Sequence, residues 1–262
     1  MIDHEKYTRH IQDPGAKERV VKALGKVEGV LKNHDIRSTE FLTPYEQQQI
    51  IGIINGFQEV TYKIEGGYQG AERQMITIFH DYLPGDTVPS SVAVIKIRNK
   101  DRFKTLSHRD YLGSVLNLGL SREKIGDILV HEDYCHLIVD HEIRDYILFQ
   151  LKKVGNAPVE LELDDFENIR APEEAVRKIS GSVSSLRLDA VISLGCKLSR
   201  RDAQALIKKG DVKVNFQETV KIAQELQQGD QISAKGFGRI HVQSLGNQTK
   251  SGRIKIILEK LL

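Results

Sequence analysis

The sequence predicts an α+β protein with three folded parts, and three observations lead to this fold class. The first 73 residues (1–73) are rich in amphipathic helix patterns. Residues 74–165 alternate strand and helix patterns in the order of a ferredoxin-like domain. After a linker at 166–182, residues 183–262 show two short helices followed by a run of strands. We therefore expect a mainly helical N-terminal region, a ferredoxin-like middle domain and a small C-terminal α/β domain.

The N-terminal helices are predicted from apolar spacing and from capping residues. In the stretch "AKERVVKALGKVEGVLKN", apolar residues recur at the spacing of one helix face. A second helix begins at "TPYEQQQIIGIING", where Thr43 suits the N-cap, Pro44 the first helical position and Glu46 the third residue after the cap. Gly56 predicts the end of this helix.

The middle domain is predicted from the order of its patterns. From Ser91 onward, strand and helix patterns follow one another as "SVAVIKIRN", "HRDYLGSVLNLG", "GDILV", "YCHLIVD", "HEIRDYILFQLKKVG" and "PVELEL". This β-α-β-β-α-β order is typical of ferredoxin-like and RNA-recognition-motif-like domains. The stretch "QMITIF" is expected as an extra strand before them.

The C-terminal domain follows an acidic and then small, polar connection, "DDFENIRAPEEAVRKISGSVSS". We expect the flexible point of this connection near Gly181. Two short helices are predicted next, at 186–195 and 200–209. The strands "VKVN", "QISA", "GRIHVQ" and "GRIKIILE" complete the domain.

The composition excludes several classes of protein. Apolar residues make up 40% of the chain and charged residues 28%, as in ordinary globular proteins. No apolar run approaches the roughly 20 residues that cross a bilayer, and "MIDHEKYTRH" does not resemble a signal peptide. Cys135 and Cys196 form no CxxC pair, which indicates a reducing compartment without disulfides. We therefore expect a cytoplasmic protein that binds no membrane.

Charge is unevenly distributed along the chain. Residues 181–262 carry 14 lysines and arginines against 7 acidic residues, a net charge of +7. The rest of the chain carries 24 basic and 29 acidic residues, a net charge of −5. A basic end on a mildly acidic body is typical of a protein that binds a polyanion with one part of itself.

The positive charge is concentrated on the helix expected at 200–209. At about 100° per residue, Ala203, Leu206 and Ile207 share one side of this helix and the cations occupy the other, with Ser199 as N-cap. Clustering of like charge suits phosphate contacts, although a solubilising surface is the alternative. The predicted phosphate contacts are Arg187, Lys197, Arg200, Arg201, Lys208, Lys209 and Lys213.

The same stretch contains a recognisable set of motifs. Arg187-Leu188-Asp189 opens one helix, and an S-R-x-x-A sequence opens the next at Ser199. The sequence K-x-G-x-V-x-V-N at 208–215 then turns into a strand, and Gly229-Asp230 follows. This combination resembles the S-four RNA-binding domain. The resemblance implies that the paired helices bind structured RNA.

The order of the parts resembles the YlmH family across nearly the whole chain. The shared features are a helical N-terminus, a ferredoxin-like middle that carries "HRDYLGSVLNLGLSREKIGDILV", and a C-terminal S-four domain. YlmH proteins are bacterial RNA-binding proteins encoded beside cell-division genes. They resemble small S-four proteins such as heat-shock protein fifteen, which engage the large ribosomal subunit carrying stalled peptidyl-tRNA. The resemblance implies ribosomal RNA and tRNA as ligands, in ribosome-associated quality control.

One aromatic residue, Phe237, and one acidic residue, Asp189, suggest further candidate sites. "KGFGRIHV" begins like an RNA-recognition-motif signature but then departs from it, so we expect a glycine-flanked turn. Phe237 in that turn is a candidate for stacking on a base. Asp189 follows R-L, as the aspartate of pseudouridine synthases does, but no T-x-G stretch comes after it. We expect Asp189 to be a structural acid near a helix start, paired with an arginine.

Other signals lie in the middle domain. Its RNA-recognition-motif-like topology has Tyr134 and His136 as the only candidate stacking rings. Four metal-ligand residue types, His131, Cys135, His136 and His141, lack a standard zinc spacing, and Cys135 and His136 should point to opposite faces of a strand. Arg109 and Arg122 are secondary candidates for RNA contact, with plain surface charge as the alternative.

These observations predict a non-catalytic RNA-binding protein that needs no cofactor or metal. One alternative is an RNA-modifying enzyme of the pseudouridine synthase type, and another is a scaffold linked to cell division. Against an enzyme, the sequence has no nucleotide-binding or methyl-donor motif. We expect a monomer that binds RNA on the large ribosomal subunit and that can hold a protein partner through its N-terminal domains.

Overall fold

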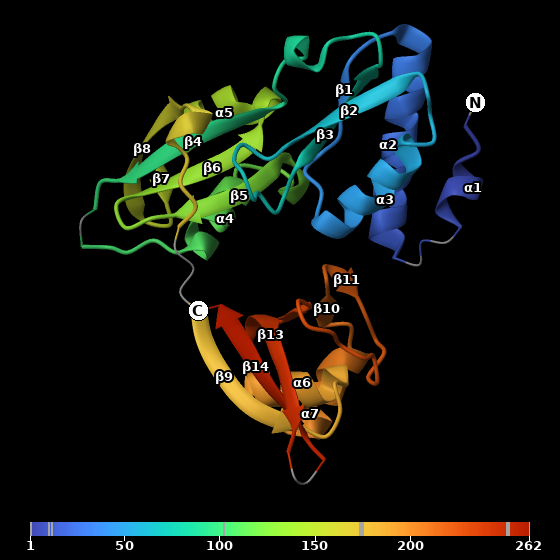
Figure 1. Cartoon of the computed structure of the whole chain (residues 1–262). Coiled ribbons are helices and arrows are strands. Elements are labelled where there is room, and N and C mark those ends of the chain that lie inside the picture. The colour runs from blue at the N-terminus through green and yellow to red at the C-terminus, as the bar shows by residue number, and fades with distance from the viewer. Residues whose placement is uncertain are drawn as a thin grey trace. The chain divides into compact units, whose positions relative to one another are not determined.

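The computed structural model describes residues 2–9, 11, 13–101, 103–172, 176–249 and 252–261. The chain divides into two compact units, residues 1–172 and 173–262 (Figure 1). Helices and strands are mixed in both units, which confirms the predicted α+β class.

The N-terminal unit begins with three helices. They are α1 (His4–Thr8), α2 (Pro14–Asn33) and α3 (Pro44–Ile54). The predicted capping box of α3 is present, because the Glu46 carboxylate accepts the Thr43 N–H at 2.7 Å and the Thr43 hydroxyl accepts the Glu46 N–H. The apolar faces of α2 and α3 share one core, which includes Val20, Leu24, Ile50 and Ile54.

Residues 37–80 contain more strand than the sequence patterns predicted. Strands β1 (Arg37–Ser38), β2 (Val60–Glu65) and β3 (Met75–His80) form a small antiparallel sheet in the order β1-β3-β2. The strand expected to extend the middle domain is therefore the centre of an N-terminal sheet. All six residues of β3 are buried, so hydrophobicity alone did not reveal which partners the strand would take.

The middle of the unit has the predicted ferredoxin-like topology. Its sheet has the order β5-β6-β4-β8-β7, and β4 lies between β6 and β8. The helices α4 and α5 cover one face, where Ile95 and Leu137 of the sheet pack with Val115 and Ile147 of the helices. The bounds are β4 (Val92–Asn99), α4 (His108–Leu116), β5 (Ile125–Val130), β6 (Tyr134–Asp140), α5 (Arg144–Gln150), β7 (Lys153–Val154) and β8 (Ala157–Asp164).

A second core joins the two halves of this unit on the opposite face of the middle sheet. Phe41 and Met75 from the N-terminal half pack there against Val94 and Ile138. The Arg73 guanidinium donates to the Phe41 carbonyl at 2.9 Å and to the Ile125 carbonyl at 3.1 Å, which links both halves. The two halves therefore form one compact body.

In its described residues, the C-terminal unit has a six-stranded antiparallel sheet and two helices, α6 (Leu188–Cys196) and α7 (Arg200–Lys208). The strand order is β11-β10-β12-β13-β14-β9. A single core joins the helices to the sheet through Val191, Ile207, Ile240 and Leu258. The strands are β9 (Val176–Val183), β10 (Val212–Val214), β11 (Gln217–Glu218), β12 (Gln231–Ala234), β13 (Gly238–Gln248) and β14 (Ile254–Leu261).

Residues 176–182, within the predicted linker, form a strand. They belong to β9, which pairs with β14 along its full length, from Val176–Leu261 to Val183–Ile254. Gly181 is not a flexible point, because a Cβ there would lie 2.7 Å from a methyl group of Leu194. The polar composition suggested a connection, but the pairing partner lies about seventy residues later in the sequence.

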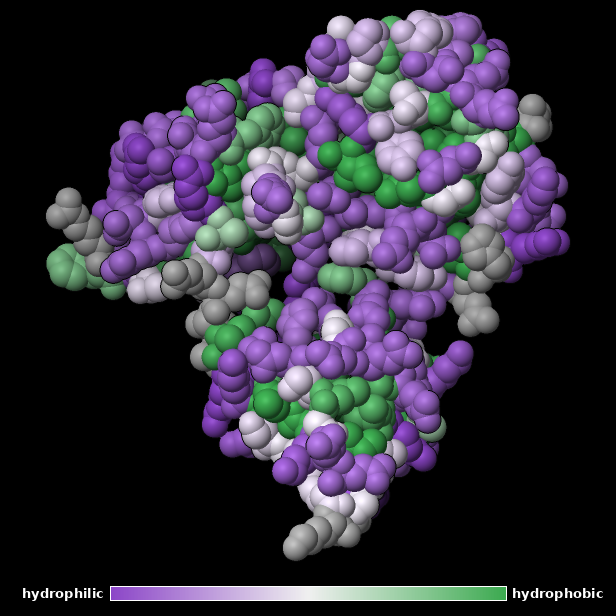
Figure 2. Space-filling model, in the orientation of Figure 1, coloured by the Kyte–Doolittle hydropathy of each residue, from purple (hydrophilic) through white to green (hydrophobic). Residues whose placement is uncertain are grey.

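The surface shown in Figure 2 is mostly hydrophilic, with hydrophobic residues in separate patches. Within the described residues, no helix combines the length and the hydropathy needed to cross a bilayer.

Candidate RNA interface

The candidate interface is built on the helices α6 and α7, which pack against each other. Leu188, Val191 and Ile192 of α6 and Ala203 and Ile207 of α7 are buried, which turns the remaining faces outward. The Ser199 hydroxyl caps α7 by accepting the Asp202 N–H at 3.1 Å. In the structure, α7 therefore has one buried apolar face and one exposed face, as its sequence predicts.

A buried carboxylate organises the base of this surface. Asp189 has no exposed area, and its oxygens accept hydrogen bonds from Arg200 at 2.7 Å, from Gln204 at 2.8 Å and from Arg187 at 3.2 and 3.4 Å. Burial alone would raise the pKa of Asp189, but these hydrogen bonds leave the pKa below its ordinary value. The charged carboxylate therefore holds side chains from both helices in one arrangement.

The predicted cations fall into three groups. Arg187 and Arg200 are held by Asp189 while their side chains stay 40% and 42% exposed. Lys209 and Lys213 form surface ion pairs with Asp211 at 3.1 Å and Glu218 at 3.2 Å. The third group is exposed and has no carboxylate within ion-pair distance in the described parts of the chain: Lys197, Arg201 and Lys208.

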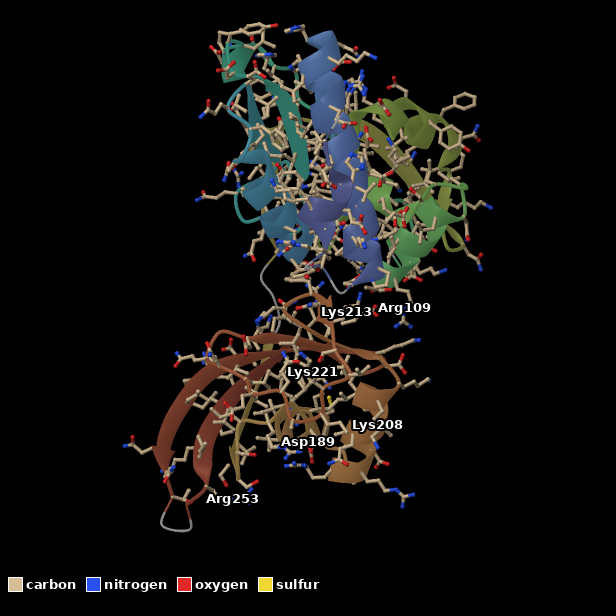
Figure 3. The ribbon with its side chains drawn as sticks, turned by 90° about the vertical axis from the view of Figure 1, so that its right-hand side faces the viewer. Arg109, Asp189, Lys208, Lys213, Lys221 and Arg253 are labelled. Carbon is tan, nitrogen blue, oxygen red and sulfur yellow. The ribbon has the colours of Figure 1, made fainter. Side chains whose placement is uncertain are left out.

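We call the seven cations Arg187, Lys197, Arg200, Arg201, Lys208, Lys209 and Lys213 the basic ledge. Figure 3 shows Asp189 and Lys208 at the paired helices and Lys213 farther along the same unit. The acids that pair with its members, Asp189, Asp211 and Glu218, all come from the C-terminal unit itself. The ledge keeps an excess of positive charge, because seven cations face three such acids.

Phe237 is the residue that the sequence offers for stacking on a base. It lies in the predicted glycine-flanked turn between β12 and β13, with Gly236 and Gly238 both at positive φ. Its ring is partly buried and packs against the core of the C-terminal unit. The sequence placed the turn correctly, but the packing of the ring depends on residues from the whole sheet.

Two polar residues were missed by sequence reasoning. Gln204 completes the set of donors around Asp189, and its position four residues after Arg200 on α7 was an available signal. Lys221 is exposed on the segment after β11, and in Figure 3 it lies between Lys213 and the paired helices.

The middle-domain candidates are separated by the fold. Cys135 packs in the helix-side core, whereas His136 lies on the other face of β6 and contacts Asp164 at 3.0 Å. No group of three His, Cys, Asp or Glu side chains in the described residues is arranged to hold a metal ion. Arg122 is an internal residue: its guanidinium donates to the Ile125 and Gly126 carbonyls, and burial lowers its pKa to about 10. Arg109 is exposed.

Comparisons with known families match the three parts of the chain. The family "YlmH, N-terminal" matches residues 15–83, "Putative RNA-binding domain in YlmH" matches 89–168, and "S4 domain" matches 186–232. The S4 match covers α6, α7, β10 and β11, and ends at the start of β12. These matches define an RNA-binding protein of the S4-domain class.

Its relatives specify the family. The chain is 33% identical over 231 residues to "Ribosome-associated protein quality control protein P2" of Bacillus subtilis (strain 168), an alignment that covers 88% of this chain and 90% of that protein. The chain belongs to the YlmH family, as its sequence predicted.

A solved structure is similar in fold. "Cell division protein ylmH from Streptococcus pneumoniae" aligns with a TM-score of 0.50 and 23% identity, and the alignment covers 60% of this chain and 96% of that one. At this identity the likeness shows the fold alone.

Proposed function

We propose that this chain is a non-catalytic factor that grips structured RNA through the basic ledge. The observation that carries the proposal is the clamp at Asp189, which fixes Arg187 and Arg200 side by side across two helices. A guanidinium has five N–H donors, so an arginine that gives one or two to Asp189 keeps others for a phosphate. The exposed Arg201 and Lys208 add cations that no carboxylate of the described chain neutralises.

The same clamp argues against chemistry at Asp189. A catalytic aspartate must reach its substrate, yet this carboxylate has no exposed area and already accepts hydrogen bonds from three side chains. Its surroundings suit a positioning residue. This supports a binding role over RNA modification of the pseudouridine synthase type.

The proposed ligand is ribosomal RNA or tRNA on the large ribosomal subunit. The printed name of the Bacillus subtilis relative supports a role in ribosome-associated quality control. The ledge offers point charges and guanidinium groups but no exposed aromatic ring, so we propose that it recognises RNA shape and phosphate spacing more than base sequence.

The first test is the salt dependence of RNA binding by Arg201→Ala. Arg201 is exposed and unpaired among the described residues, so its removal should weaken binding without disturbing the fold. We expect the slope of log K against log salt to fall by about 1, the loss of one phosphate contact. Arg201→Lys should restore affinity only partly, because the lysine ammonium cannot form a bidentate contact. The measurement is binding of purified large ribosomal subunits at several salt concentrations.

The matched control is Arg177→Ala, which removes an exposed arginine from β9 instead of the ledge. An equal loss of slope in both variants would show that binding depends on net charge and not on the ledge. Modification of ribosomal RNA or tRNA that disappears in a deletion strain would establish the enzyme alternative.

A further inference from the structure

The loop between β4 and α4 presents an unusual side chain. Phe103 is fully exposed to solvent, more so than any other large hydrophobic residue in the described parts of the chain. A single exposed ring is ordinary by itself. The backbone around Phe103 and the charges beside it make this one informative.

The turn that carries Phe103 is held by hydrogen bonds. The Asn99 side chain accepts the Asp101 N–H at 3.0 Å and donates to the Lys104 carbonyl at 2.6 Å. The Asp101 carboxylate accepts the Phe103 N–H at 3.1 Å. These hydrogen bonds hold the described backbone on both sides of the ring, at Asp101, Phe103 and Lys104, which reduces the backbone entropy that binding would remove.

Three cations, Lys104, Arg109 and Lys153, lie at this end of the domain. Hydrogen bonds from Ser107 lower the pKa of Asp110, and the nearby charges of Lys104 and Arg109 lower it further. Gly155 lies in the turn that joins β7 to β8. A Cβ added to Gly155 would lie 3.9 Å from the Lys104 ammonium, so Lys104 reaches this turn. Lys153, two residues before this turn, is exposed. Figure 3 shows Arg109 projecting outward from the start of α4.

The sheet of this domain offers no comparable surface. Ion pairs join β4 to β8 at Lys96–Asp164, Arg98–Glu162 and Lys100–Glu160, with distances of 3.6, 2.8 and 3.4 Å. The carboxylates of this ladder would repel phosphates.

The rings on this face are also engaged within the protein. The Tyr134 ring stacks on His131 at 4.4 Å and lies 4.8 Å from the Lys96 ammonium, while His136 is only 1% exposed. On the face that RNA-recognition-motif domains use for stacking, these rings therefore already make contacts within the protein.

We propose that the Phe103 loop, described at residues 100–101 and 103–106, is a second RNA contact, in which the ring of Phe103 stacks on an unpaired base while Lys104, Arg109 and Lys153 face the phosphates. This inference rests on the proposed RNA-binding function and adds a single-stranded segment to the ligand. Aromatic rings beside cations are the usual means of holding single-stranded RNA, because every base has a face on which a ring can stack. Two contacts on one chain strengthen binding to an RNA that presents both elements.

The test uses a tryptophan reporter, since the full-length chain contains no tryptophan. Phe103→Trp should stack as phenylalanine does, and its fluorescence should be quenched when a short oligouridylate of about twelve nucleotides is added. Phe103→Ala should bind the same oligomer about tenfold more weakly or worse. Circular dichroism and thermal melting of each variant will show that it is folded.

Phe166 provides the matched control. Its side chain is exposed as well, but Phe166 lines the same pocket as Val92 at the start of β4, about 23 Å along the strand from the end that carries the Phe103 loop. Phe166→Trp should show no quenching, and Phe166→Ala should bind the oligomer as the unaltered chain does.

The outcomes separate this inference from the proposed function of the ledge. Absence of quenching in folded Phe103→Trp, or unchanged oligomer binding by Phe103→Ala, overturns the inference even if Arg201→Ala weakens ribosomal subunit binding. If Phe103→Ala lowers subunit binding but leaves oligomer binding unchanged, the ring docks into a protein pocket and the inference is equally overturned. Quenching that persists in a Phe103→Trp, Arg201→Ala double variant supports a contact independent of the ledge.

Discussion

At the scale of single residues, Asp189 shows how a buried charge can prepare a binding surface. A carboxylate in an apolar interior is costly unless it is fully hydrogen-bonded, and Asp189 meets this condition with donors from Arg187, Arg200 and Gln204. The same hydrogen bonds fix the two arginines before any ligand arrives. The acid that superficially resembles a catalytic residue thus explains the geometry of the cations.

We predict that Asp189→Asn destabilises the C-terminal unit by about 2 kcal/mol, because charge-assisted hydrogen bonds are exchanged for weaker ones while the two arginines stay partly hydrated. The folded-state pKa of Asp189 is depressed, so its stabilisation is complete above the unfolded-state pKa of about 4 and is lost as the pH falls toward the folded-state pKa. The difference between the variant and the unaltered chain should therefore shrink below pH 4. Urea unfolding at a series of pH values measures it.

Asp202→Asn is the control for this prediction, because Asp202 is an exposed acid on the first turn of α7. Its effect should be a few tenths of a kcal/mol. A pH-independent difference between Asp189→Asn and the unaltered chain would contradict the assignment of a charged carboxylate.

At the scale of elements, β9 shows that a polar segment can form a strand that its sequence pattern does not predict. Its residues "VRKISGSV" lack strong alternation, and four of the first five are exposed. What holds the strand is its full-length pairing with β14 and the close approach of Leu194 to Gly181. The glycine is there because α6 packs onto the sheet at that point, and not to provide flexibility.

We predict that Gly181→Val lowers the stability of the C-terminal unit by about 1–3 kcal/mol, the usual cost of overpacking. The new side chain would meet the Leu194 methyl groups and force α6 away from the sheet. Ser180→Val, at the exposed neighbouring position, should be close to neutral or slightly stabilising because valine favours strands. Thermal unfolding of both variants decides between a packed strand and a loose connection, since a loose connection would tolerate both changes.

At the scale of the whole molecule, the chain is built from two units that each bury an apolar core of their own. The N-terminal unit is further unified by Arg73 and by the Phe41 core, which tie its helical half to the ferredoxin-like half. The C-terminal unit draws its core from α6, α7 and its own sheet.

We predict that a fragment of residues 173–262 folds alone and unfolds cooperatively, because its core is complete within that range. Differential scanning calorimetry should find its transition close to one of the transitions of the full chain. A fragment that lacks a cooperative transition would show that the N-terminal unit supplies necessary contacts.

Local signals account for what the sequence predicted well. The cap at Ser199, the capping box at Thr43 and Glu46, and the apolar spacing of α7 all act over three or four residues, so they can be recognised along the chain. The β-α-β-β-α-β order of the middle domain could be predicted for the same reason, because each strand and helix has its own local pattern. The location of the basic ledge followed from one amphipathic helix and its motif.

Contacts between distant residues account for what the sequence did not predict. The pairing of β9 with β14, the place of β3 in the N-terminal sheet and the packing of Phe237 against the core each depend on segments far apart in the chain. The sequence by itself determined the helices, their caps and the positive charge of the C-terminal unit. Only the tertiary structure decided which cations share Asp189 and which remain unpaired, because ion pairing depends on how separate elements pack together.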